Sequence, residues 1–89
     1  MARSHRKELF VTYTEERRKY EFIKNLEMTL FLDHERNDIE SIDYIYQREY
    51  DDEIIVITYM GGHEERILTT GNSNGANAKA IINAIYKEV

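Results

Sequence analysis

The chain has 89 residues, neither cysteine nor proline, and a formal net charge of −5, so it is the length of one small domain. It lacks an apolar run long enough to span a membrane and a secretory signal pattern, and without cysteine it can form neither disulfides nor a thiolate metal site. The first 24 residues carry a net charge of +3 and the remainder −8. An acidic body repels phosphates, so we expect a cytoplasmic protein that does not bind nucleic acid directly.

The N-terminal third begins with a short basic segment. Residues 1–7 show no apolar periodicity, and we expect them to form a mobile arm. A single α+β domain should follow over residues 8–89, because no linker or low-complexity stretch interrupts it.

Alternating apolar residues predict strands in this third of the chain. Such runs cover residues 8–14, 19–24 and 26–33, and the last alternates strictly. Strict alternation is typical of a strand with one buried face. We therefore favour strands for this region.

A helix is the alternative for the same region. Residues 15–35 are rich in Glu, Arg, Lys and Leu, which favour helix. Thr12 and Glu15 have the spacing of a capping box. A helical stripe is also present, formed by Phe22, Ile23, Leu26 and Leu30.

Residues 41–70 have the pattern of a three-stranded antiparallel meander. The run 54–57 is Ile-Ile-Val-Ile, and β-branched residues favour strands. Both faces of this strand are apolar, which predicts a central strand that is covered on both sides. Gly61 and Gly62 separate it from the next strand and predict a tight hairpin.

A helix is predicted over residues 76–88. Ser73 or Asn72 is a suitable N-cap. The predicted apolar face consists of Ala78, Ile81, Ile82, Ile85 and Val89, with Asn77, Lys79, Asn83 and Lys87 elsewhere.

The predicted fold is thus α+β, with an antiparallel meander sheet of about five or six strands and one C-terminal helix on one face. One helix leaves the other face of the sheet uncovered. We therefore expect a homodimer, unless the N-terminal strands fold over that face.

Tyrosines and carboxylates cluster around the turn between the first two meander strands. Tyrosine offers a large contact area with a polar tip and is enriched at interfaces. An acidic, tyrosine-rich face would suit a protein partner with a basic surface; the other interpretation is a sheet face buried by the N-terminal strands. The candidate partner-binding residues are Tyr44, Tyr46, Glu49, Tyr50, Asp51, Asp52 and Glu53.

The loop GNSNG, residues 71–75, offers a second candidate site. Amides at a helix N-terminus attract anions, so an anionic small molecule such as a nucleotide is the alternative ligand. The spacing departs from that of a P-loop, and an ordinary capped turn explains it equally. The candidate ligand-binding residues are Gly71, Asn72, Ser73, Gly75 and Lys79.

Nothing in the sequence points to catalysis, a cofactor or a metal. His34 and His63 each stand beside acidic residues, but adjacent residues on a strand point to opposite faces and make poor chelates. No nucleophile, base and acid have the spacing of a known catalytic set. We therefore expect a protein that is not an enzyme.

The composition resembles that of small acidic accessory proteins from bacteriophages and mobile elements of AT-rich Gram-positive bacteria. The resemblance rests on the Ile, Asn, Lys, Glu and Tyr content, as in the segment NAKAIINAIYKEV, and on the absence of Cys and Pro. It implies a non-enzymatic binding protein that inhibits a host enzyme or defence system, or that sequesters a signalling nucleotide.

Overall fold

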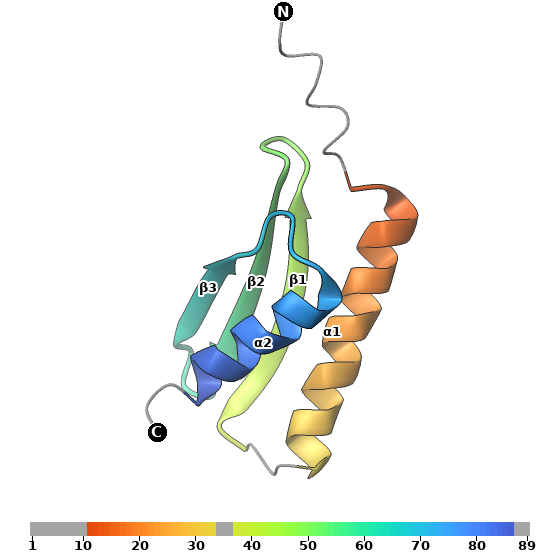
Figure 1. The fold of residues 1–89 in the computed structure, drawn as a ribbon. Coiled ribbons are helices and arrows are strands. Elements are labelled where there is room, and N and C mark those ends of the chain that lie inside the picture. The colour runs from red at the N-terminus through yellow and green to blue at the C-terminus, as the bar shows by residue number, and fades with distance from the viewer. Residues whose placement is uncertain (1–10, 34–36, 87–89) are drawn as a thin grey trace, which may run out of the picture.

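The protein is an α+β domain in which two helices pack on one side of a three-stranded sheet (Figure 1). The computed structural model describes residues 11–33 and 37–86. The three strands are antiparallel and lie in the order β1-β2-β3. In chain order the elements are α1 (Tyr13–Asp33), β1 (Ile39–Gln47), β2 (Asp52–Tyr59), β3 (Glu64–Leu68) and α2 (Asn74–Ile85). The α+β class is confirmed, but the prediction of five or six strands and a single helix is wrong.

The N-terminal third is helix α1 and not a set of strands. The strands predicted over residues 19–24 and 26–33 are wrong, because both runs lie within this 21-residue helix. The strand predicted over 8–14 is also wrong in its described part, since helix begins at Tyr13; residues 8–10, like the arm at 1–7, lie outside the described residues.

A reciprocal cap starts α1 where the alternative interpretation placed it. The amide of Glu15 donates to the Thr12 hydroxyl over 3.0 Å, and the amide of Thr12 donates to the Glu15 carboxylate over 3.1 Å. Ile23 and Leu30 of the helical stripe are fully buried, whereas Met28, on the face expected from strict alternation, is exposed. Neither helix in the described part of the chain is long and apolar enough to cross a membrane.

The meander is confirmed, with β2 as the central strand. Both tight-turn glycines have positive φ, 97° at Gly61 and 98° at Gly62, a conformation that side chains disfavour. Ile55 and Ile57 of β2 are fully buried.

Helix α2 begins at the predicted cap and ends earlier than expected. The Ser73 side chain accepts a hydrogen bond from the amide of Ala76. Ile81 and Ile85 are buried as predicted, but the position of Asn77 outside the buried face was predicted wrongly, because Asn77 is fully buried. The buried face of α2 is therefore rotated toward Asn77 relative to the predicted face, and Ile82 is partly exposed.

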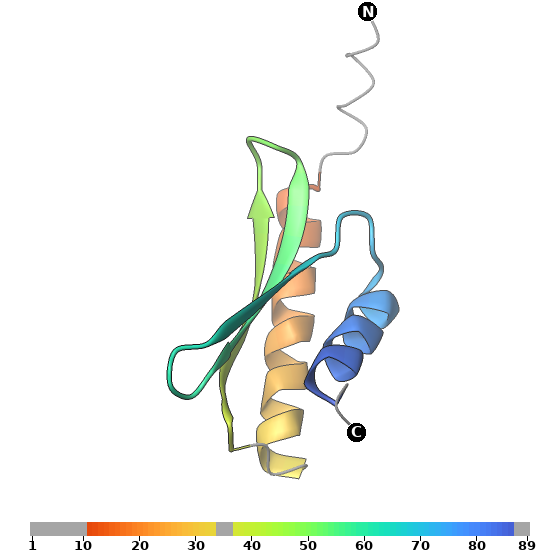
Figure 2. The same ribbon diagram turned by 90° about the vertical axis from the view of Figure 1, so that its left-hand side faces the viewer.

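Both helices lie on the same side of the sheet (Figure 2). The core between them joins residues from α1, all three strands and α2. Helix α1 also closes the free edge of β1, because Glu27 accepts a hydrogen bond from the amide of Ile42 over 2.7 Å and Lys24 pairs with Asp43 over 2.8 Å. Covering an edge strand in this way reduces its tendency to pair with another strand.

Candidate functional site

A buried carboxylate connects four parts of the fold. Glu53, at the start of β2, is 2% exposed. Its carboxylate accepts hydrogen bonds from Lys19 Nζ on α1 at 2.6 Å, from the Tyr44 hydroxyl on β1 at 2.5 Å and from the amide of Gly71 at 2.8 Å. These contacts hold α1, β1 and the β3–α2 loop in fixed relative positions.

The pKa values of this cluster follow from burial and its hydrogen bonds. Burial alone would raise the pKa of Glu53, but the bonds from Lys19, Tyr44 and Gly71 outweigh it and hold the pKa below the usual range. Burial also raises the pKa of the Tyr44 hydroxyl strongly, and its bond to the Glu53 carboxylate raises it further. An ionised Glu53 beside a neutral Tyr44 is therefore the stable arrangement.

A second buried pair closes the turn between β1 and β2. The Tyr46 hydroxyl donates to the Asp51 carboxylate and accepts from the amide of Val11 over 3.2 Å. Asp51 has a φ of 57°, in the left-handed region that Asp enters more readily than most residues. The pKa of Tyr46 is raised, first by burial and then by its bond to Asp51.

Arg48 joins this turn to the start of α1. Its guanidinium pairs with Glu16 and lies over two tyrosine rings, 4.3 Å from the centre of Tyr13 and 4.9 Å from that of Tyr46. Cation–π contacts at exposed sites contribute about 0.5–1 kcal/mol each. The first turn of α1 and the β1–β2 turn therefore form one continuous surface at the same end of the molecule (Figure 1).

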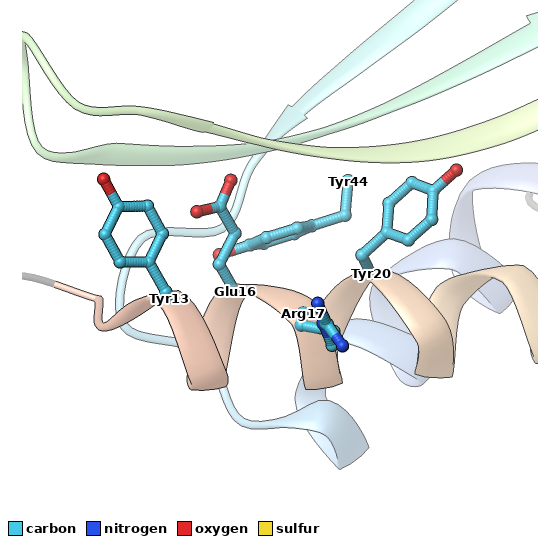
Figure 3. A pocket seen from close by; sticks show the side chains of 5 residues that line it. All are labelled: Tyr13, Glu16, Arg17, Tyr20 and Tyr44. Atoms are coloured by element: carbon cyan, nitrogen blue, oxygen red, sulfur yellow. The ribbon is translucent and has the colours of Figure 1, made fainter.

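A pocket of about 290 Å³ lies along this surface, between α1 and β1. Tyr13, Glu16 and Tyr20 extend from α1 toward the strands, and the ring of Tyr44 lies between Glu16 and Tyr20 (Figure 3). Tyr13 is 78% exposed and Tyr20 44%. Arg17 completes the lining and is exposed. We use the name α1–turn surface for the exposed residues Tyr13, Arg17, Tyr20, Glu49 and Tyr50.

The tyrosines and carboxylates that the sequence predicted as one partner-binding face fall into a buried group and a solvent-exposed group in the structure. Tyr44, Tyr46, Asp51 and Glu53 are buried and bond to one another in two pairs. Glu53 and Tyr44 lie against α1, and Tyr46 contacts Val11 just before it, where the sequence-based alternative expected strands. Solvent reaches the other members of the group, Glu49, Tyr50 and Asp52, with Tyr50 65% exposed.

The GNSNG loop uses two of its amides and one of its side chains within the fold. The amide of Gly71 donates to Glu53 and that of Asn72 to the carbonyl of Thr69, while the Ser73 hydroxyl accepts from the amide of Ala76 in α2. Gly75 lies in the first turn of α2, and Lys79 is exposed one turn later. These bonds account for the loop as a capped turn.

A cavity of about 170 Å³ lies beside this loop. Arg18, Lys19 and Asn74 line it together with Glu15. Of its two cations, Lys19 already pairs with Glu53, and Glu15 adds a negative charge. The cavity is therefore poorly suited to an anion.

Sequence reasoning missed Tyr13, Arg17 and Tyr20. These residues are neighbours because positions three and four apart share a helix face, which strands would not provide. The capping box of Thr12 and Glu15 was the signal that would have revealed them.

Within residues 11–33 and 37–86, no three His, Asp or Glu residues come together in a way that would hold a metal ion. The candidate His34 lies outside the described residues, and His63 lies in the β2–β3 turn, its ring stacked on Tyr59 with the two ring centres 5.5 Å apart.

Comparison with known proteins finds no matching family model, no matching curated protein and no matching solved structure.

Proposed function

We propose that the protein is a non-enzymatic binding protein that inhibits or sequesters a protein partner through the α1–turn surface. The observation that carries this proposal is the exposure of Tyr13 and Tyr20 on either side of a pocket whose base, Tyr44, is fixed from below by Glu53. Tyrosine and arginine are the residues most enriched at binding hot spots.

The contacts beneath this surface support the proposal. Lys19 and Tyr44 are both bonded to Glu53, and Arg48 holds the ring of Tyr13 from below. Side chains that are already ordered lose less conformational entropy when a partner binds. Contacts of this kind beneath Tyr13 and the pocket would lower the entropy cost of binding there, which supports the proposal.

Charge favours a partner that carries basic groups. The protein has a net charge of −5, and Glu49 and Asp52 reach solvent at the β1–β2 turn. Asp51 and Glu53 are buried and contribute little to such contacts. Arg17 and Arg18 add positive charge on α1, so the complementary surface of the partner should be mixed, with its cations facing the turn.

The resemblance in composition to bacteriophage accessory proteins supports an inhibitory or anti-defence role inside the host cell. The absence of cysteine is in keeping with action in the cytoplasm. We also propose that the protein acts as a homodimer, as expected from the sequence, because no described helix or strand lies on the side of the sheet opposite the two helices (Figure 2).

Capture of a partner from cell lysate tests the proposal. The tagged protein and its Tyr13→Ser/Tyr20→Ser variant are compared, with Met28→Ser as the matched control on the same helix. Met28 is also exposed but lies two turns further along α1, away from the pocket. We expect one protein that the wild type and the Met28 variant retain and that the double variant loses.

A panel of nucleotides, measured by thermal shift, separates this function from the alternative at the GNSNG loop. A nucleotide-dependent rise in melting temperature that Lys79→Ala abolishes would contradict the proposal. Equal retention of the captured protein by all three chains would also contradict it.

A further inference from the structure

The face of the sheet that points away from both helices carries an apolar row. Ile45 on β1 pairs with Ile54 on β2, and Ile54 pairs with Leu68 on β3. Ile45 is 40% exposed and Leu68 68%. Because successive residues of a strand point to opposite faces, all three lie opposite the buried Tyr44 and Ile55.

The neighbouring row on this face has opposite charges at its two ends. Asp43 on β1 pairs in register with Val56 on β2, which pairs with Arg66 on β3. Asp43 also contacts Lys24, but its carboxylate remains partly exposed. Arg66 is exposed. Val56 between them is only 6% exposed, so the row presents a negative end and a positive end on either side of a largely buried apolar residue.

This pattern is complementary to itself under two-fold symmetry. A two-fold axis parallel to the strands and above β2 places β1 of one copy over β3 of the other. Asp43 then faces Arg66 of the second copy, Ile45 faces Leu68, and Val56 meets its own counterpart. Such a closed arrangement is the commonest form of homodimer, and two sheets packed in this way keep their strands within about 30° of each other.

We propose that this face packs against the same face of a second copy, forming a two-fold β-sandwich dimer. The inference specifies the surface of the proposed homodimer and is independent of the α1–turn surface, which lies on α1 and the β1–β2 turn. β1 and β2, of nine and eight residues, extend about 27–31 Å at 3.4 Å per residue, and β3, of five residues, extends about 17 Å. Together their shared face can bury several hundred Å² per copy. Interfaces of that size are at the small end of stable ones, and we expect micromolar affinity.

The charge pairs allow a sharp test by sedimentation velocity from micromolar to millimolar protein. The wild type should double in mass as its concentration rises. In a dimer of the Arg66→Asp variant two carboxylates would face each other across the interface, and in a dimer of the Asp43→Arg variant two guanidinium groups would do so. Each variant should therefore dimerise about tenfold more weakly or worse. An equimolar mixture of the two variants has two attractive pairs and should recover the wild-type affinity as a heterodimer.

Circular dichroism of each variant checks that its fold is retained, and the mixture provides a readout that a folding defect cannot imitate. A wild-type protein that stays monomeric to millimolar concentration would overturn the proposal. So would single variants that dimerise as tightly as the wild type, or a mixture that remains as weakly associated as its components.

Discussion

Replacing Glu53 with Gln should destabilise the fold far more than the same change at an exposed position. Three donors converge on the Glu53 carboxylate, at 2.5 to 2.8 Å, and a glutamine amide would turn its NH₂ group toward at least one of them. Hydrogen bonds to charged groups contribute about 1.5–3 kcal/mol each, and removing one partner of a fully buried ion pair costs about 3–5 kcal/mol. Because Lys19 is 19% exposed, water recovers part of this loss. We expect Glu53→Gln to cost about 2–4 kcal/mol.

Urea denaturation followed by circular dichroism at helical wavelengths measures this loss, since the chain has no tryptophan. Glu49→Gln makes the same chemical change at an exposed turn residue and should shift the free energy of unfolding by less than about 0.5 kcal/mol. Lys19→Met combined with Glu53→Gln should cost less than the sum of the two single changes, because the pair is coupled. Equal losses for Glu53→Gln and Glu49→Gln would refute the role given to Glu53.

Four further predictions test the account of the fold. Thr12→Ala should lower the free energy of unfolding by about 1 kcal/mol, because it removes half of the capping box; chemical denaturation checks this. Asn77→Leu should raise the same quantity by about 1–3 kcal/mol, because neither polar atom of this buried amide has a partner among the described residues; a lower melting temperature would contradict it. The depressed pKa of Glu53 stabilises the fold fully above its ordinary value of 4.5, and this contribution is lost as pH falls through the lowered pKa. The wild type should therefore converge on Glu53→Gln in acid when denatured at a series of pH values. The raised pKa of Tyr44 acts in the opposite direction, and stability should fall as pH rises above 10.0, a loss that Tyr44→Phe should reduce.

The elements with local signals were predictable from the sequence. Gly61 and Gly62 have the positive φ that a primed turn requires, and Ser73 caps its helix through its own side chain. The helix in the N-terminal third was not predictable in the same way, because Leu26 and Leu30 satisfy both the period of a strand and the spacing of a helix. Only the tertiary fit, in which Ile23 is buried and Met28 is exposed, distinguishes the two.

The candidate site was less predictable than the fold. Its contacts join residues far apart in the sequence: Lys19 and Glu53 are separated by 34 positions, and Glu16 and Arg48 by 32. Asp51, an acidic residue that looked exposed by composition, is buried, and its carboxylate accepts a hydrogen bond from the hydroxyl of Tyr46 on β1. Such pairings depend on where α1 lies on the sheet, which no local pattern specifies.

Site-specific photo-crosslinking tests the central claim most directly. A photoreactive phenylalanine derivative replaces Tyr20, Tyr50 or, as the control, Met28, all of which are exposed, and the protein is irradiated in cells that contain its partner. We predict a covalent adduct with one other protein from positions 20 and 50 and none from position 28. Adducts of equal yield from all three positions, or an adduct from position 28 alone, would contradict the assignment of the α1–turn surface as the binding site.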